Sequence, residues 1–195
     1  MEDRKLNEQE SLELISRMIR NTRERMEEYT GIHFLIWGYT TVAVSVIVWY
    51  MFTFSKADTQ LWNWFWLAIP VIGGLVYWLY SRNSHPPRSE SYLDRVISCV
   101  WMVLGITGTG VALLALLTVV PIPVLFLIAL IMGMGSTITG LIVQFTPLVI
   151  AGIAGLALAG LLLVIPGPNQ ILCFAFIFVV LMIVPGHILN YLGRR

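Results

Sequence analysis

The sequence predicts an all-α membrane protein, a six-span transmembrane helical bundle preceded by a cytoplasmic amphipathic helix. Only 12% of its 195 residues are charged and 57% are hydrophobic, whereas a soluble domain has about 25% charged residues. Fourteen of the 23 charged residues lie in residues 1–30, and no Asp, Glu, Lys or Arg occurs in residues 96–193. The apolar remainder divides into stretches of about 20 residues, which is the length of a helix that crosses a bilayer.

Residues 1–31 are expected to form the amphipathic helix, and residues 32–195 the transmembrane domain. Apolar residues recur in the first part at intervals of three and four residues, which is the period of a helix with one apolar face. These residues are Leu12, Ile15, Ile19 and Met26, and Met18 widens the stripe. Thr30 and Gly31 are predicted to end this helix or to form a hinge before the first span.

Three uses of the apolar stripe stay open. The helix can lie on the inner leaflet with its arginines near acidic head groups, it can pack under the bundle, or it can pair with a partner helix. A second copy of the chain is one such partner, because positions 12, 15, 19, 22, 26 and 29 fit a heptad seam, although Thr22 weakens it. The other possible partner is a different cytosolic or membrane protein.

Six apolar segments are long enough to span the membrane, at residues 32–54, 61–80, 96–120, 124–145, 147–165 and 171–192. Proline and glycine mark the last three breaks between them as turns. The break at Pro147 is the least distinct. A kinked long helix or a re-entrant pair is the alternative to two separate spans at this position.

The positions of Lys and Arg predict that both termini lie on the cytoplasmic side of the membrane, which we expect to be a bacterial inner membrane. With six spans, eleven of the twelve basic residues fall on one side of the membrane and only Lys56 on the other. Short cytoplasmic loops carry such an excess of basic residues. An even number of spans is therefore favoured, because five or seven would separate the basic residues at the two ends of the chain.

Neutral polar residues are prominent in the third and fourth spans, which hold no charged residue. The strings GITGTG (105–110) and GMGSTITG (133–140) combine glycine with hydroxyl residues, a combination that is typical of close helix packing. They can instead line a narrow path for a small neutral or weakly held solute. The residues of this predicted path are Thr107, Thr109, Ser136, Thr137, Thr139 and Gln144.

The fifth span carries small residues at four-residue spacing, namely Ala151, Gly155 and Ala159. A face of small side chains lets two helix backbones approach closely. We therefore expect this face to pack against a neighbouring helix.

The three histidines, His33, His85 and His187, all fall on the inner side in the predicted topology. Histidine titrates near neutral pH and binds metals. No carboxylate or cysteine lies at ligand spacing beside any of them. We therefore expect three unrelated interfacial histidines and no metal site.

The sequence predicts neither an enzyme nor a cofactor site. It contains no HExxH, GxSxG, Walker loop or paired-cysteine motif, and its loops are too short to hold a catalytic domain. A net charge of +1 gives no indication of nucleic-acid binding. The lipid bilayer is the partner that the composition predicts.

The run ESLELISRMIRNTRERME, followed by FLIWGY and near the end by VPGHILN, resembles a group of small uncharacterised bacterial polytopic membrane proteins with an amphipathic helix at the front. The resemblance covers the N-terminal third and the last span, and it implies a location in the membrane. It implies no activity and gives no catalytic residue to carry over.

Two classes of function follow from these features. The first, which the sequence slightly favours, is a channel or transporter for a small neutral or weakly held solute. The alternative is a non-catalytic regulatory or assembly protein whose amphipathic helix binds a partner. A water-accessible cavity that reaches Thr109, Ser136 or Gln144 would indicate the first, and a dry bundle with an exposed apolar stripe on the amphipathic helix would indicate the second.

Overall fold

The computed structural model describes residues 8–54, 63–83, 92–118 and 121–192, and for residues 8–30 it describes the course of the backbone alone. The elements of this described part are all helices, with no strand among them. Six helical stretches are long and apolar enough to cross a membrane. The predicted fold class is therefore confirmed at the level of an all-helical chain with six helices that are long and apolar enough to span a membrane.

The first two spans have different internal structure. Helix α1 (Glu8–Phe54) is a single helix of 47 residues, and its residues Gly31–Phe54 form the first span. The second span combines a short 3₁₀ helix, η1 (Trp64–Leu67), with α3 (Ala68–Asn83). The predicted start of this span at residues 61–62 lies outside the described residues.

The third and fourth spans are helices α4 (Tyr92–Leu117) and α5 (Val124–Val143). Helix α4 begins four residues before the predicted position 96, so the predicted boundary is wrong there. Asp94 lies in the first turn of α4, where a carboxylate interacts favourably with the helix dipole. The charged residues that suggested a loop are therefore compatible with the start of the helix.

The last two spans are interrupted helices. The fifth consists of α6 (Thr146–Ala159) and the short α7 (Leu161–Val164). The sixth runs through α8 (Asn169–Phe178), the π-helical turn η2 (Val179–Ile183) and α9 (Val184–Leu192). Both spans agree within a few residues with the segments predicted from the sequence.

A tight turn at Gln144 separates α5 from α6, so the predicted break between two spans is confirmed. Gln144 adopts a left-handed conformation with φ of 56°. The Phe145 N–H donates to the carbonyl of Gly140 at 2.9 Å, and the Gln144 N–H donates to that of Leu141 at 3.3 Å. These two bonds form a Schellman cap. Pro147 follows in the first turn of α6, where a proline needs no N–H.

Pro185 explains the wider turn in the centre of the sixth span. A proline has no N–H, and its ring clashes with the carbonyl four residues earlier, here that of Leu181. The helix widens just before this proline, and the Val184 N–H donates to the carbonyl of Val179, five residues earlier. The span therefore continues without a break past the proline, as Asn169–Leu192.

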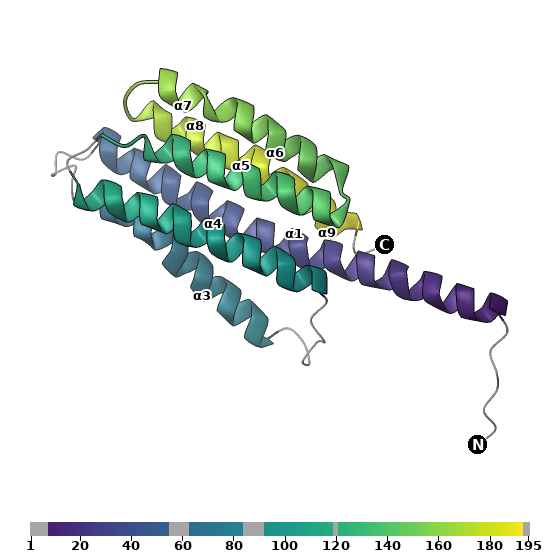
Figure 1. Cartoon of the computed structure of the whole chain (residues 1–195). Helices are drawn as coiled ribbons and strands as arrows, with labels where there is room; N and C mark the ends of the chain where they lie inside the picture. The colour runs from purple at the N-terminus through teal and green to yellow at the C-terminus, as the bar shows by residue number, and fades with distance from the viewer. Residues whose placement is uncertain (1–7, 55–62, 84–91, 119–120, 193–195) are drawn as a thin grey trace.

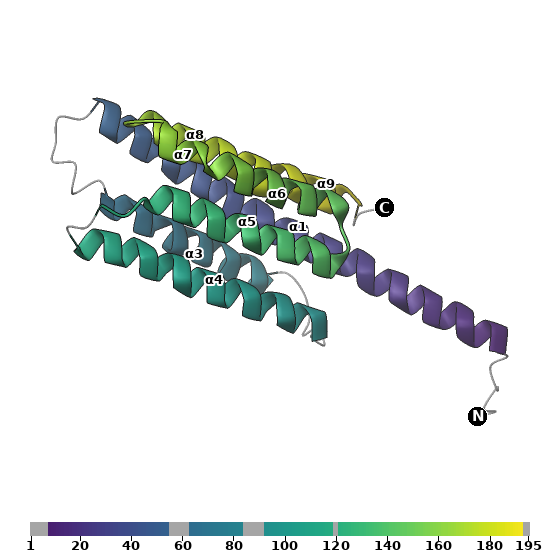
Figure 2. The ribbon, with the colours of Figure 1, turned by 45° about the horizontal axis from the view of Figure 1, so that its top comes forward.

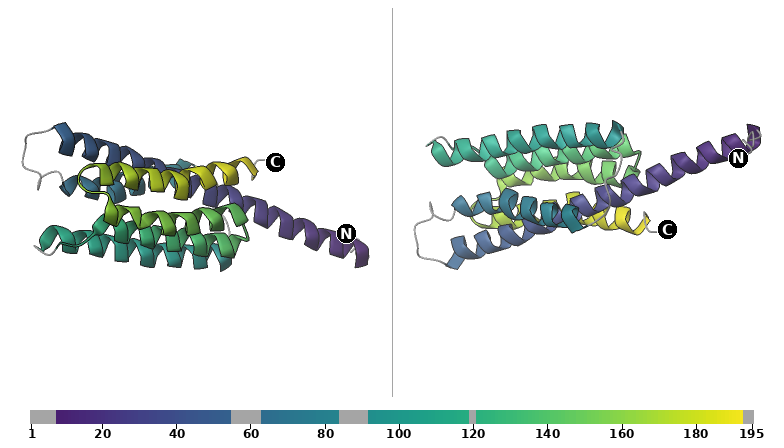
Figure 3. Two further views of the ribbon diagram at one scale, coloured as in Figure 1. Left: turned by 90° about the horizontal axis from the view of Figure 1, so that it is seen from above. Right: turned by 90° about the horizontal axis from the view of Figure 1, so that it is seen from below.

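The spans pack in two layers, which the views from above and below separate (Figure 3). One layer holds α1 between α3 and the sixth span, and the other holds α5 between α4 and α6 (Figures 1 and 2). The layers meet closely where α6 lies on η2 and where α5 lies on α8. At the opposite edge α3 and α4 are barely in contact. The two layers are therefore least closely packed along this side of the bundle, which we call the open α3–α4 edge.

Gly31 shows that the predicted stop or hinge is wrong, because α1 continues through it without interruption. A Cβ on Gly31 would lie 2.9 Å from the backbone N of Asn190 and 3.1 Å from the carbonyl O of Gly186. Gly38, two turns later, would bring its Cβ to 3.0 Å from the Cβ of Met182. These glycines allow α1 to lie close against the sixth span.

One end of the bundle gathers several features of the chain, and we call it the front end. Residues 8–30 of α1, which we call the front helix, project from this end (Figures 1 and 2). The end of α9, the turn at Gln144, the end of α3 and the start of α4 lie there too. The described ends of the chain are therefore at the same end of the bundle, as an even number of spans requires.

Candidate functional site

The predicted path residues of α4 do not face the inside of the bundle. Thr107 and Thr109 are both exposed. The Thr107 hydroxyl donates to the carbonyl of Val103, one turn earlier in the same helix, at 2.8 Å. Between the two threonines, Gly108 is buried against the side chain of Ile128 in α5. The glycine thus packs on α5 and the threonines flank the contact.

The predicted path residues of α5 lie in helix contacts. Ser136 and Thr139 are fully buried, and the Thr137 hydroxyl donates to the carbonyl of Gly133 at 2.8 Å. Gln144 is the exposed cap of the helix. None of the six predicted residues lines either of the two cavities described below. Within the described residues, Ser136 and Thr139 therefore lie inside the bundle, and Gln144 lies at its surface.

Thr139 has a specific role in holding α4 against α5. The Trp101 Nε1 donates to the Thr139 Oγ1 at 3.0 Å, and the Thr139 hydroxyl donates to the carbonyl of Gly135 at 2.8 Å. A Cβ on Gly135 would lie 3.3 Å from the Trp101 ring. Gly135 leaves space for the indole of Trp101, and Thr139 accepts the hydrogen bond that this indole donates.

The small residues of the fifth span, Ala151, Gly155 and Ala159, are all buried in α6. A Cβ on Gly155 would collide with the side chain of Leu181 in η2. This face of α6 therefore lies against the sixth span, at the edge where the two layers meet closely.

The two described histidines, His33 and His187, lie in different helix contacts. His33 is half-buried where α1, α3 and α4 meet. His187 is exposed on α9, and its Nε2 lies 2.8 Å from the hydroxyl of Tyr39 in α1. His85 lies outside the described residues. In the described part of the chain, no three His, Cys, Asp or Glu side chains are grouped as a metal site would need.

A cavity with aromatic and polar walls lies at the open α3–α4 edge, and we call it the His33 cavity. Its volume is about 200 Å³. Helix α1 contributes two of its lining residues, α3 one and α4 four. The lining residues are His33, Phe34, Tyr77, Ile97, Ser98, Trp101 and Met102.

Aromatic rings surround His33 in this cavity. The ring centroid of Tyr77 lies 5.0 Å from that of His33 in an edge-on arrangement, and the centroids of Trp37 and Trp101 lie 6.3 Å from it. Phe34 meets Trp101 edge-on at 5.5 Å. Aromatic pairs favour such tilted and edge-on contacts. The rings of three helices therefore fix the position of the imidazole.

Two polar groups of the cavity lack a partner in the described part of the chain. Neither ring nitrogen of His33 makes a hydrogen bond there, and Nδ1 is fully enclosed. The Ser98 hydroxyl likewise makes no hydrogen bond to a described residue. Thr107, on the same helix, donates to its own backbone, which is the common arrangement for a hydroxyl in a membrane helix. Ser98 is exposed, so its hydroxyl can form a hydrogen bond with a ligand that enters the cavity.

Sequence reasoning identified His33 but missed the residues around it. Tyr77, Ser98 and Trp101 come from helices that are separate in the sequence, and no motif connects them. The available signal was the helical spacing of Ser98, Trp101 and Met102, which places them on one face of a helix. That signal does not say which neighbouring helix the face meets.

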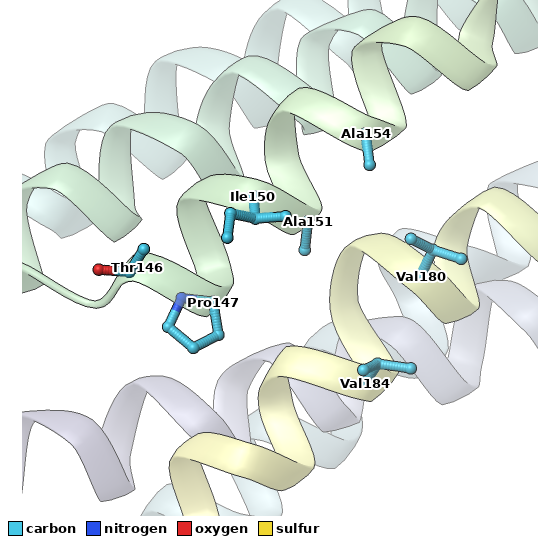
Figure 4. A pocket seen from close by; sticks show the side chains of 7 residues that line it. All are labelled: Thr146, Pro147, Ile150, Ala151, Ala154, Val180 and Val184. Atoms are coloured by element: carbon cyan, nitrogen blue, oxygen red, sulfur yellow. The ribbon is translucent and has the colours of Figure 1, made fainter.

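The second cavity is an open groove between α6 and the sixth span (Figure 4). Its volume is about 370 Å³. Apart from the Thr146 hydroxyl its walls are apolar. The lipid tails around a membrane bundle are equally apolar, so the groove can be filled by a lipid tail. The lining residues are Thr146, Pro147, Ile150, Ala151, Ala154, Val180 and Val184.

The predicted interaction residues of the front helix lie outside the described side chains. They are Leu12, Ile15, Met18, Ile19 and Met26, for which the structure gives the helical backbone alone. That backbone leads away from the bundle in each of the views (Figures 1 to 3). The front helix is therefore not packed under the bundle.

Comparisons of the chain with protein-family models, with curated proteins and with solved structures find no match. The evidence for function therefore consists of the course of α1, the packing of α4 against α5, and the His33 cavity.

Proposed function

We propose that the protein is a non-catalytic assembly protein of the bacterial inner membrane, which presents its front helix to a protein partner. The observation that supports this most is the continuity of α1. It is one helix from Glu8 to Phe54, and only Gly31–Phe54 belongs to the span. Because a helix rises about 1.5 Å per residue, residues 8–30 reach roughly 35 Å beyond the membrane.

This continuity favours one of the three uses that the sequence leaves open. A helix that lies on a leaflet runs in the plane of the interface, but the front helix continues the direction of a spanning helix without a hinge. It also leads away from the bundle. Pairing with a partner, either a second copy of the chain or another protein, is the use that both observations support.

The apolar stripe is the surface through which such a partner would bind. Burial of one Leu, Ile or Met side chain is worth about 1.5–3 kcal/mol, whereas an exposed charge pair one turn apart is worth about 0.2–0.5 kcal/mol. Burial of the stripe therefore dominates the placement of the front helix. The charged face remains in water.

The attachment of α1 to the bundle makes the front helix a stiff extension of it. Helix α1 lies between α3 and the sixth span, and Gly31 and Gly38 are in close contact with the sixth span. A partner that displaces the front helix therefore acts directly on the centre of one layer. This arrangement suits a protein that holds or senses a partner at the membrane.

Transport of a small solute, which the sequence slightly favours, has less support from the helix packing. Ser136 and Thr139 are buried in the contact between helices, whereas Thr107 and Thr109 are exposed on the outside. Neither described cavity reaches these residues. Among the two predicted functions, partner binding is therefore the one that we favour.

Site-directed photo-crosslinking in native membranes tests this function. A photoreactive phenylalanine analogue at Ile15 or Ile19 is expected to give one discrete adduct, and the same analogue at Glu13 or Arg17, on the charged face, is expected to give none. Mass spectrometry of the adduct distinguishes a second copy of the chain from another protein. Equal labelling of both faces, or no adduct from the stripe, would show that the front helix binds no partner.

A further inference from the structure

The His33 cavity lies where a molecule in the bilayer can enter it. His33 is two residues from the start of the first span, and Tyr77 lies in the last two turns of the second. This places the cavity near the front end, at the depth of the membrane interface. Helices α3 and α4 are barely in contact at this edge, and Met102, which lines the cavity, is 60% exposed. A ligand can therefore reach the cavity sideways from the lipid, between α3 and α4.

The walls of the cavity favour a neutral ligand. Among the described residues that line it, none is an Asp, Glu, Lys or Arg. A phosphate group is usually bound by Arg or Lys, and Arg82, the basic residue at the end of α3, has its guanidinium 5.4 Å from the ring of Trp78 instead. A phospholipid head group therefore lacks its usual partners here.

The size and the aromatic character of the walls favour a flat ring. A volume of about 200 Å³ is below the roughly 300–1,000 Å³ of pockets for drug-sized molecules, so one ring or two fused rings fill it. Phe34, Tyr77 and Trp101 present aromatic surface, against which a flat ring packs favourably.

The two polar groups define the rest of the ligand. A hydroxyl donates one hydrogen bond and accepts up to two, whereas a neutral imidazole donates one from one ring nitrogen and accepts one at the other. Ser98 and His33 therefore fit oxygens at the edge of the ring, as in a carbonyl or a phenol. A ligand that comes from the bilayer also carries an apolar tail, and the open edge between α3 and α4 leaves room for it.

We propose that the His33 cavity binds the head group of an isoprenoid quinone, with the ring between Tyr77, Trp101 and Phe34 and a ring oxygen on Ser98 or His33. Benzoquinone and naphthoquinone head groups share this chemistry. The proposal concerns binding alone and involves no electron transfer. It does not depend on the function proposed for the front helix, because the cavity is formed by the spans.

Photoaffinity labelling of the full chain in phospholipid nanodiscs tests the proposal. An azido-quinone with a short isoprenoid tail is expected to label the peptide that contains residues 92–102, and excess decylubiquinone or a short-tailed menaquinone is expected to compete. Which of the two competes better identifies the head group. Squalene, which has the tail without the ring, is expected not to compete.

Matched substitutions locate the binding groups. Ser98→Ala and His33→Ala are each expected to reduce the competed labelling about 3- to 10-fold, the loss that one hydrogen bond brings. Thr107→Ala, on the same helix, is the control and is expected to leave labelling unchanged. The far-ultraviolet circular dichroism and the thermal midpoint of each variant show whether it is folded.

Three results would overturn the proposal. They are labelling spread evenly over the lipid-facing helices, competition by squalene as strong as by the quinones, and undiminished labelling in folded Ser98→Ala and His33→Ala variants. If His33→Ala does not fold, Ser98→Phe replaces it. Its ring fills the cavity from α4, and it is expected to abolish the competed labelling.

Discussion

Individual glycines decide how closely the helices of this bundle approach each other. A Cβ on Gly140 would lie 2.8 Å from the backbone N of Val149, within the hairpin of α5 and α6. Gly31 is equally close to Asn190 in α9. In lipid, where apolar side chains gain little from leaving the solvent, such close backbone contact is a main source of helix association.

Replacement of Gly31 with leucine is expected to lower the thermal midpoint of the protein in detergent micelles. A leucine there would overlap the backbone of α9, and overpacking of a tight contact costs about 1–3 kcal/mol. Gly105→Leu is the matched control, because nothing lies within 4 Å of the position where its Cβ would be. Equal midpoints for the two variants would show that α1 and α9 are not in close contact.

The same glycine also shows where sequence reasoning fails at the scale of a residue. Thr30 and Gly31 stand where the chain changes from charged to apolar, and glycine at such a boundary is typical of a helix end. Glycine is equally typical of close helix contact. The sequence around Gly31 cannot separate these two uses, because the deciding atoms belong to Gly186 and Asn190.

At the scale of an element, the turn between α5 and α6 is marked in the sequence by a proline, but its left-handed position is held by a residue other than glycine. Pro147 predicts the break, and the structure places it in the first turn of α6. The left-handed residue of the turn is Gln144, with φ of 56°, although a residue with a side chain is disfavoured in this conformation by about 1–2 kcal/mol. The turn is therefore kept at a cost in stability.

Gln144→Gly is expected to raise the free energy of unfolding by up to about 1 kcal/mol, because glycine adopts the left-handed conformation without strain. Gln144→Val is expected to lower it, since a β-branched side chain is the least compatible with positive φ. Urea or thermal unfolding of the two variants in the same detergent measures the difference. A valine variant as stable as the glycine variant would contradict the role of the cap.

The spans themselves could be predicted because length and hydropathy are properties of one segment. Helix starts were less certain. Helix α4 begins at Tyr92 because a carboxylate near a helix start is stabilising, so charge alone does not exclude a residue from a helix. The hydropathy of each segment therefore predicts the number of spans, but it predicts the ends of each helix only to within about one turn.

At the scale of the whole molecule, the arrangement of the spans could not be predicted. Spans that are apolar on every side carry no strong periodic signal for the face that meets a neighbour. The two layers, the open α3–α4 edge and the His33 cavity all depend on such pairings. For the same reason the polar path was predicted from composition alone, without knowledge of which helix faces meet. In the structure, Ser136 and Thr139 lie inside the bundle, whereas Thr107 and Thr109 are exposed.

The topology of the whole molecule gives a direct test of the proposed orientation. Reporter tags before Met1 and after Arg195 are both expected to report the cytoplasm, and a tag within residues 55–60 is expected to report the periplasm. The reason is the excess of Lys and Arg on the side of the termini. A periplasmic C-terminal tag would contradict both the orientation and the even number of spans.

The contact between Gly31 and α9 has a consequence for the biosynthesis of the protein. Helix α1 is translated about 150 residues before the residues that cover its glycine face. At about 5–20 residues per second, the delay is on the order of 10 s. During that time Gly31 and Gly38 face lipid or the insertion machinery. A nascent chain that ends before α8 keeps this face uncovered, so translation of the last span completes the bundle.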